Sequence, residues 1–187
     1  MREREHGVHE QFLARRSSRA MDGTAIATTE LLTLFEAARW APSSGNNQPW
    51  RFLWAQRGTP HFERFFELLI EQNKTWCKTA GALVVVVSKT TRDRDGSRSR
   101  THSFDTGAAW MSIALQGTTL GLVVHALEGF DYDRARKELG VPDDHAVEAM
   151  IAIGHPADPS SLPEPYRARE QPSPRRPLGE IHREGGF

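Results

Sequence analysis

The stretch that most constrains this chain is residues 37–52, where a helical pattern passes through a short polar turn into a strand pattern. Apolar residues recur at positions i, i+3, i+4 and i+7 over residues 30–40, which predicts one amphipathic helix. Pro42 ends that helix, because proline lacks a backbone donor and disfavours helical geometry in the residue before it. Residues 50–55 are mostly apolar and aromatic, and they predict a strand.

The turn itself, residues 42–48, has two interpretations. Gly45 and the two asparagines after it tolerate positive φ, so the turn can be tight. Its serine, asparagine and glutamine side chains supply several donors and acceptors in a short span, which suits a flat polar ligand. A plain connection between a helix and a strand would have the same composition. Composition alone favours the plain connection.

The totals exclude several classes of protein. The 187 residues are enough for one domain with a sizeable core. Lysine plus arginine equals aspartate plus glutamate at 24 each, which argues against a dedicated nucleic-acid binder. The single cysteine, Cys77, excludes an intramolecular disulfide framework and fits a reducing cytoplasm. The longest apolar run, residues 80–87, is far shorter than the ~18 residues that span a bilayer, and the charged N-terminus is no signal peptide. We therefore expect a cytoplasmic protein with no membrane partner.

The remaining patterns predict further elements. Pro60 begins a helix whose aromatic stripe, over residues 60–70, is expected to pack in the core. Residues 83–87 form a leucine and valine run, typical of a strand buried on both faces. Asp105 is expected to cap a helix over residues 108–120, which is apolar almost all round and therefore buried. The other expected elements are strands at 122–127 and 148–153, a helix at 133–139, and an exposed loop at 89–103.

The two ends of the chain differ from the middle. Residues 1–11 are expected to form a flexible tail. Residues 156–187 contain seven of the eleven prolines, so they are expected to build neither helix nor inner sheet and to lie extended over a surface or be disordered. The basic cluster at 15–19 suits an anion in charge and geometry, and two further basic groups lie in the C-terminal segment at 167–169 and 175–176. Charge clusters are more often simply solvated.

Common catalytic and metal motifs are absent from the sequence. It has no His-Glu-x-x-His or Cys-x-x-Cys pattern, so no metal site is expected. It also has no Gly-x-Ser-x-Gly elbow, and no Gly-x-Gly-x-x-Gly opens a helix. Cys77 precedes an apolar strand and is interpreted as packing rather than as a nucleophile.

Four motifs carry a family resemblance, each weak alone but specific in this order and spacing. They are Arg15-x-Ser17-x-Arg19, Pro42-Ser43-Ser44-x-Asn46-x-Gln48-Pro49-Trp50, Glu128-Gly129-Phe130-Asp131 and Arg175-Arg176-Pro177-Leu178. With them, the chain resembles the FMN-dependent nitroreductase family from residue 12 to residue 181. One further motif, Asp-x-Gly-x-Ala at 105–109, matches only approximately, and Trp110 stands where the family often has asparagine.

The resemblance implies a fold and an assembly. The expected fold is α+β, with three α-β-α layers around a central, mostly antiparallel sheet. Residues 12–155 would form the FMN-binding core, and residues 156–187 an arm that extends onto a partner subunit. The resemblance also implies a homodimer with FMN at the subunit interface, and the apolar helix at 108–120 in that interface.

The implied activity is that of an oxidoreductase. NAD(P)H would give hydride to flavin N5, and a nitroaromatic, quinone or activated alkene would then receive it in a ping-pong cycle, with no side chain as general acid or base. A non-catalytic flavin store or redox sensor of the same fold needs the same binding residues and stays open. An adaptor that binds acidic partners through residues 167–176 is a further alternative, which zero net charge disfavours.

The resemblance assigns the cofactor contacts residue by residue. The phosphate group would be held by Arg15, Ser17 and Arg19, with Arg16 between them and Arg175 from the arm. The ribityl chain and ring edge would meet Ser43, Ser44 and Asn46. The backbone of Glu128 and Gly129 would face N5. The same site would include Pro42, Gln48, Asn73 and Leu127, although Asn73 alone also suits a helix cap.

Overall fold

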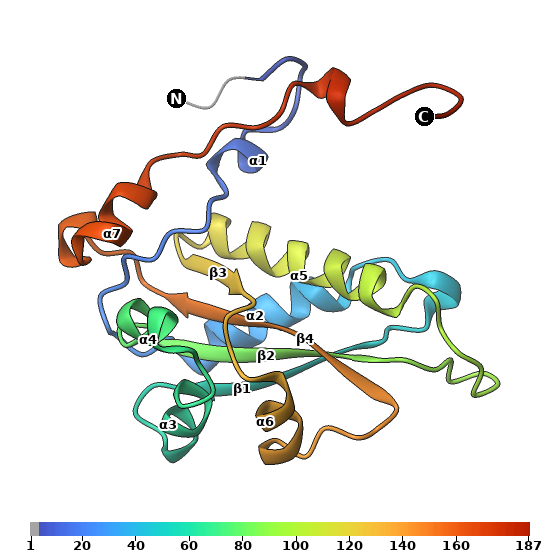
Figure 1. Ribbon diagram of the computed structural model, residues 1–187, viewed down its shortest axis with the longest axis horizontal. Coiled ribbons are helices and arrows are strands. Elements are labelled where there is room, and N and C mark those ends of the chain that lie inside the picture. Colours follow the sequence, from blue (N-terminus) through green and yellow to red (C-terminus); the bar gives the residue numbers. More distant parts are fainter. Residues whose placement is uncertain (1–3) are drawn as a thin grey trace.

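A computed structural model describes residues 4–187, which form one antiparallel four-stranded sheet with helices on both faces (Figure 1). The strand order is β1-β2-β4-β3, and all three neighbouring pairs are antiparallel. The strands are β1 (Trp50–Gln56), β2 (Ala82–Lys89), β3 (Val123–Leu127) and β4 (His145–Gly154). Each predicted strand is confirmed to within a few residues, and β4 begins earlier than predicted.

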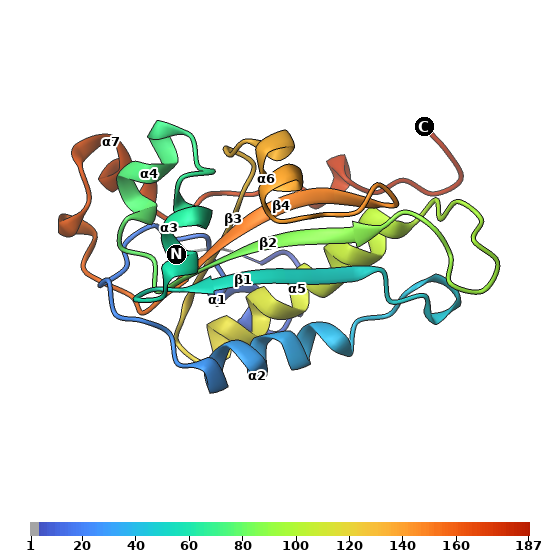
Figure 2. The same ribbon diagram turned by 90° about the horizontal axis from the view of Figure 1, so that it is seen from below.

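The helices form the outer layers. Helices α2 (Thr28–Arg39) and α5 (His102–Thr119) cover one face of the sheet (Figure 2). Helices α3 (Pro60–Phe66), α4 (Glu71–Cys77) and α6 (Tyr132–Glu138) cover the other face. The predicted three-layer α-β-α arrangement is therefore confirmed. In residues 4–187 no helix combines the length and the apolar character that crossing a bilayer would need.

Strand β2 lies inside the sheet, and its side chains contribute to the hydrophobic cores on both faces. Leu83, Val85 and Val87 pack with the helices α3, α4 and α6. Val84 and Val86 pack with α2 and α5 on the opposite face. Successive strand side chains point to opposite faces, so a run of apolar residues is what a doubly covered strand requires. The expectation of a strand buried on both faces is confirmed.

One predicted helix is two. The aromatic stripe that begins at Pro60 ends its helix at Phe66, and α4 begins only at Glu71. Leu69 between them pairs with Phe130, and the Ile70 amide donates to the Gly129 carbonyl at 3.1 Å. These contacts with the turn after β3 replace the helical bonds that the periodicity predicts. The expectation of one continuous helix over 60–70 was therefore wrong.

The start of α5 also differs from the prediction. Asp105 lies inside the helix, which begins at His102 with Thr101 as its N-cap residue. The Asp105 side chain is buried and accepts a hydrogen bond from Thr101 Oγ1 at 3.0 Å. The cap assignment for Asp105 was wrong, because three residues before it already belong to the first turn.

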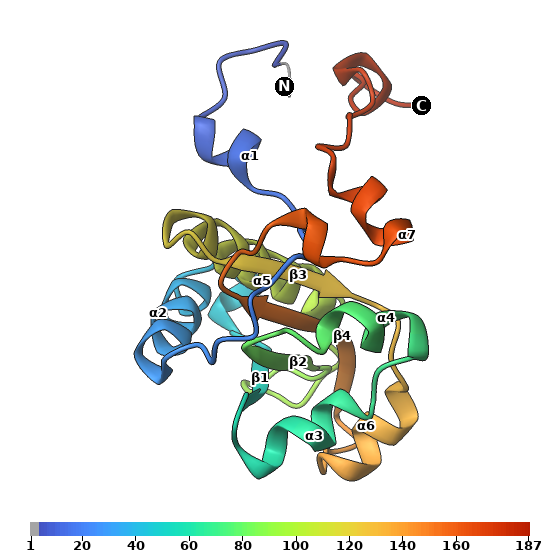
Figure 3. The same cartoon turned by 90° about the vertical axis from the view of Figure 1, so that its left-hand side faces the viewer.

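The two terminal segments run beside each other, away from the sheet (Figures 1 and 3). Helix α1 (Glu10–Ala14) docks on α5, where Gln11 Nε2 donates to the Leu115 carbonyl at 3.0 Å. The predicted tail boundary at residue 11 thus falls inside α1, and residues 1–3 of that tail lie outside the described part. At the other terminus, the Leu178 amide donates to a Glu5 carboxylate oxygen at 3.0 Å.

The proline-rich arm contains helical turns. Helix α7 (Glu164–Arg167) follows Pro163 and has Pro165 in its first turn, where the missing donor costs nothing. The arm also contains the 3-10 turns η2 (Pro159–Ser161), η3 (Ala168–Glu170) and η4 (Leu178–Glu180). The expectation that this segment builds no helix was therefore wrong, since prolines at helix starts favour single turns.

Candidate functional site

A basic cavity forms where the segment 15–19 meets the arm. Its volume is about 270 Å³, and its wall brings together all the predicted phosphate residues. The residues that line it are Arg15, Arg16, Ser17, Ser18, Arg19, His125, Arg169, Glu170, Gln171, Pro172, Ser173 and Arg175. Five arginines face one carboxylate, so the cavity has a strong positive excess. Guanidinium groups match phosphate oxygens in geometry as well as charge, so this donor set fits a phosphate group.

The one carboxylate of the cavity, Glu170, organises the segment 15–19. Its side chain is only 3% exposed, and it accepts hydrogen bonds from Ser18 Oγ and, at 3.0 Å, from the Arg19 amide. The Arg19 guanidinium lies 3.8 Å from the same carboxylate. Arg16 donates to the Glu170 carbonyl oxygen at 3.1 Å. Glu170 could not be recognised from the sequence, because its partners lie about 150 residues away and no local pattern marks it.

A second residue that was not predicted, His125 of β3, also fixes the segment 15–19. Its Nδ1 donates to the Ser18 carbonyl at 2.9 Å, which fixes the proton on that nitrogen. Its ring packs against Trp76 at a centroid distance of 4.6 Å, and the Arg19 guanidinium lies 5.7 Å from the Trp76 ring centroid. Arg19 is thus fixed between an aromatic ring and a carboxylate.

Acid is expected to destabilise this cluster. Burial is the main cause that lowers the pKa of His125 from 6.5 to about 4; the charges of Arg19 and Arg15 contribute to this shift, and the Ser18 hydrogen bond and Glu170 oppose it. The unfolded chain therefore binds more protons than the folded chain between these values, so stability is full above pH 6.5 and falls toward pH 4. At pH 5 the loss in unfolding free energy is about 2 kcal/mol.

Urea unfolding of the wild type and of His125→Asn from pH 8 to pH 5 measures this loss. The asparagine amide can donate to the same carbonyl but does not titrate in this range. We expect the variant to lose about 2 kcal/mol less than the wild type over that range. Parallel pH curves for the two proteins would contradict the assignment to His125.

The turn after β3 lies next to this cluster. Asn73 Nδ2 donates to the Gly129 carbonyl at 3.0 Å, and Asn73 Oδ1 accepts from Trp76 Nε1 at 3.1 Å. Asn73 therefore sits inside α4 and joins the turn to the basic cavity, and its interpretation as a cap after a helix was wrong. The backbone of Leu127, Glu128 and Gly129 follows directly, with the Glu128 side chain exposed.

The close approach of α4 explains the glycine at position 129. A Cβ there would lie 2.3 Å from Asn73 Nδ2 and 2.7 Å from Ile70 Cδ1. We expect Gly129→Ala to lower the unfolding free energy by about 1–3 kcal/mol, since overpacking forces neighbours to shift. Gly179→Ala is the matched control, because nothing lies within 4 Å of its Cβ position. Equal thermal midpoints for the two variants would rule out the predicted crowding.

The turn 42–48 is tight and strained. Its 3-10 turn η1 (Ser44–Asn46) has positive φ at Gly45 and Asn46, and Gln48 follows at φ 44°. A non-glycine residue held at positive φ is uncommon, and such strain often marks functional sites. The Gln48 amide donates to Ser43 Oγ at 3.0 Å, while Pro42, Ser44, Asn46 and Gln48 are exposed. The side chains of this tight turn are therefore accessible to solvent.

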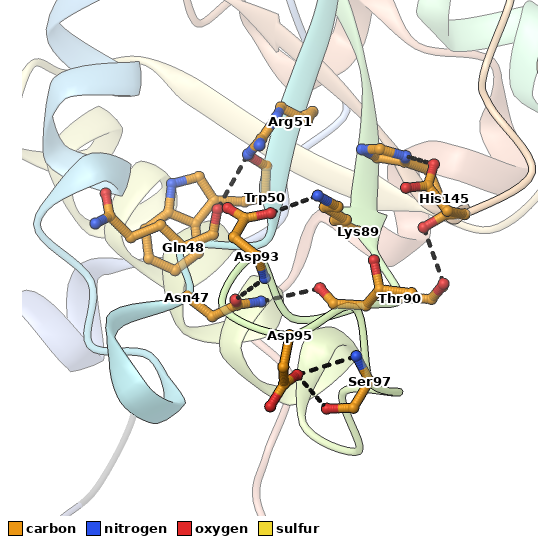
Figure 4. Close-up of polar contacts among 12 residues, drawn as sticks. Asn47, Gln48, Trp50, Arg51, Lys89, Thr90, Asp93, Asp95, Ser97 and His145 are labelled. Carbon is orange, nitrogen blue, oxygen red and sulfur yellow. Dashed lines mark hydrogen bonds and ion pairs between the residues drawn. The ribbon is translucent and has the colours of Figure 1, made fainter.

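Asn47, which the sequence analysis left unassigned, ties this turn to the loop after β2 (Figure 4). Its Nδ2 donates to the Thr91 carbonyl at 3.3 Å, and its Oδ1 accepts from the Asp93 amide at 3.0 Å. Lys89 pairs with Asp93 on the same loop. The predicted exposed loop at 89–103 is therefore shorter: Lys89 belongs to β2, His102 begins α5, and Ser99 is buried.

Within a single chain, the residues predicted to contact the cofactor lie in two separate groups. The turn 42–48 meets the beginning of α5, where the Ser44 amide donates to Asp105 Oδ2 at 3.1 Å. The segment that leads to the basic cavity meets the end of α5, where Gln11 donates to Thr119 Oγ1 at 2.9 Å. Fourteen residues of helix place these contacts about 21 Å apart along the axis. Figure 1 shows the two groups at opposite ends of the sheet.

Comparisons with known proteins agree with the fold. A crystal structure described as an oxidoreductase containing FMN matches with a TM-score of 0.96 and 43% identity, covering 100% of this chain and 96% of that chain. A structure titled "putative nitroreductase in complex with FMN", from Desulfovibrio desulfuricans, matches with a TM-score of 0.74 and 27% identity, covering 95% and 96%.

A curated relative and a family model agree with these structures. A Streptomyces coelicolor protein named "Putative NADH dehydrogenase/NAD(P)H nitroreductase" is 27% identical over 172 residues, which are 81% of this chain and 84% of that protein. The model of the nitroreductase family matches residues 13–155. This match covers most of the chain, including three of the four sequence motifs, so the chain belongs to the nitroreductase family.

Proposed function

We propose that this protein is an FMN-dependent oxidoreductase that takes electrons from NAD(P)H and reduces a small organic acceptor. The observation that carries the proposal is the continuity of the basic cavity with the Glu128–Gly129 turn through Arg19, Trp76 and Asn73. A phosphate site at one end and a turn with an exposed Glu128 at the other suit the two ends of FMN. Two structures that resemble this chain are described as containing FMN.

The residues present fit the cofactor, and each would have a limited task. Arg15, Ser17, Arg19 and Arg175 would hold the phosphate, and the backbone of Glu128 and Gly129 would contact the ring near N5. When bound, FMN would accept hydride from NAD(P)H and pass it to a nitroaromatic, quinone or activated alkene. The protein supplies position, charge and exclusion of water, and no side chain acts as general acid or base.

We further propose a homodimer in which each FMN lies between two subunits. The turn 42–48 and the segment that leads to the basic cavity contact opposite ends of α5, so the turn of one subunit would complete the cavity of the other. The outer face of α5 supports this, because Ala108 and Met111 are only half-buried and Phe104 is 80% exposed. The completed dimer would cover these apolar side chains.

Steady-state kinetics test the proposed activity. NADPH and NADH are each varied at several fixed concentrations of a quinone such as menadione, and the rate of nucleotide oxidation is followed. The proposal predicts turnover with parallel double-reciprocal lines, because donor and acceptor use the site in succession. FMN binding without turnover would instead establish a flavin store or sensor. Intersecting lines would contradict the ping-pong order.

The proposed cellular location rests on the proposed NAD(P)H donor and on the presence of one cysteine, which can form no intramolecular disulfide. Cys77 is fully buried, and burial raises the pKa of its thiol, so it stays protonated and unreactive. We place the protein in the reducing cytoplasm, where NAD(P)H is available.

A further inference from the structure

The Glu170 carboxylate lies in the wall of the basic cavity, where its negative charge would repel the FMN phosphate. Five arginines line the cavity, and Glu170 is its one acidic residue. A buried carboxylate is unfavourable unless it is paired and hydrogen-bonded, so its three partners must be in place when the arm is docked. Those partners are Ser18 Oγ, the Arg19 amide and the Arg19 guanidinium. All three belong to the segment that would bind phosphate.

Neighbouring serines of that segment are used differently. Ser17 Oγ accepts a hydrogen bond from an Arg15 guanidinium nitrogen at 3.4 Å and lines the basic cavity. Ser18 is fixed on both sides, through its hydroxyl by Glu170 and through its carbonyl by His125. Glu170 thus fixes the backbone between the two residues that would contact the phosphate, Ser17 and Arg19.

The same residue fixes the arm. Glu170 follows α7, whose Tyr166 hydroxyl donates to the Gln72 carbonyl at 2.6 Å. These two attachments hold Arg169 and Arg175 at the wall of the cavity. A further contact, from Arg16 to the Glu170 carbonyl oxygen, joins the arm to the segment 15–19 but does not involve the Glu170 side chain.

We propose that Glu170 is a positioning residue of the FMN phosphate site, a role that rests on the proposed function. It fixes Ser17 and Arg19 in place and holds the arm's arginines against the same cavity. The ordering of the segment 15–19 and of the arm favours FMN binding by more than the repulsion between the Glu170 carboxylate and the phosphate opposes it. Because docking of the arm and binding of the phosphate then favour each other, FMN stabilises the docked arm and the docked arm raises FMN affinity.

Fluorescence titration of the full-length apoprotein with FMN and with riboflavin tests the proposal. Riboflavin lacks the phosphate, so loss of a phosphate-positioning residue should affect it little. We expect Glu170→Ala to weaken FMN binding roughly tenfold or more and riboflavin binding less than twofold. Glu170→Gln, whose side-chain oxygen can accept from the Arg19 amide while its NH2 group donates to Ser18 Oγ, should restore most of the FMN affinity. Ser18→Ala should weaken FMN binding in the same direction as Glu170→Ala.

Glu164→Ala is the matched control on the arm, because Glu164 is exposed and its ion pair among residues 4–187 is with its neighbour Arg167. It should leave both affinities unchanged. Tighter FMN binding in both Glu170 variants would show that the carboxylate acts only as an opposing charge and would overturn the proposal. Equal loss of FMN and riboflavin would also overturn it, as a general structural effect.

Limited trypsin digestion gives an independent readout of the arm. FMN should protect the Arg175–Arg176 site in the wild type and in Glu164→Ala, and it should protect this site less in Glu170→Ala. Equal protection in all three proteins would contradict the link between the arm and the phosphate. If the wild type binds neither flavin, the proposed function itself fails; if the wild type binds FMN and the Glu170 variants bind it equally well, only this inference fails.

Discussion

Replacing Arg19 with alanine is expected to weaken FMN binding by about 100-fold, which is the loss of one charge-assisted contact worth roughly 2–3 kcal/mol. The Arg19 guanidinium lines the basic cavity, packs on Trp76 and lies 3.8 Å from Glu170. The Glu170 carboxylate keeps its bonds to Ser18 Oγ and to the backbone amide at position 19 in the variant. The apoprotein should therefore lose much less stability than the holoprotein loses affinity.

The measurement combines FMN titration with thermal unfolding of the apoprotein. Arg94→Ala is the control, because Arg94 is an exposed arginine whose ion pair, within the described part of the chain, is with Asp95. It should change neither FMN affinity nor unfolding. Wild-type FMN affinity in Arg19→Ala would remove this residue from the phosphate site, and with it the assignment of the segment 15–19.

Mixing two flavin-deficient variants is expected to restore flavin binding. One variant carries Arg19→Ala, and the other carries Ser44→Trp, which fills the exposed turn with a bulky side chain. If each site combines the cavity of one subunit with the turn of the other, a mixed dimer has one wild-type site and one doubly altered site. Random exchange of subunits then restores about a quarter of the wild-type flavin content.

Flavin binding by the mixture depends on whether the basic cavity and the turn 42–48 of one site come from the same chain or from different chains. The two variants are unfolded and refolded together, and bound flavin is measured after gel filtration, with each variant refolded alone as the control. Light scattering confirms that each variant is a dimer. If one chain supplied both groups, no mixture would contain an intact site. Flavin content at the level of the separate variants would therefore contradict the shared site.

Much of the fold could be predicted from local patterns, because those patterns report packing directly. The valines of β2 face both cores and the Leu31 and Leu34 stripe of α2 faces one, as their spacing predicts. The predictions failed where a distant partner overrides the local pattern. The break between α3 and α4 depends on Leu69 pairing with Phe130, which no residue near Leu69 reveals.

The candidate site was predictable to the extent that its motifs are contiguous. The resemblance assigned Arg15, Arg19 and Arg175 to one phosphate site, and the structure places all three on one cavity. Glu170 and His125 act on that cavity from the arm and from β3, and neither stands in a motif. Nor could the sequence reveal that the turn 42–48 and the segment leading to the cavity contact opposite ends of α5, since this depends on how α1 and η1 pack.

The visible absorption spectrum of the freshly purified protein, recorded during anaerobic addition of NADH or NADPH, tests whether the protein is a flavin reductase. We expect oxidised flavin bands, either from the start or after addition of FMN, and their bleaching by at least one of the two nucleotides. Bands that persist after both additions would contradict an NAD(P)H-dependent reductase and leave a flavin-binding protein. Failure to retain FMN at all would contradict the account of the site itself.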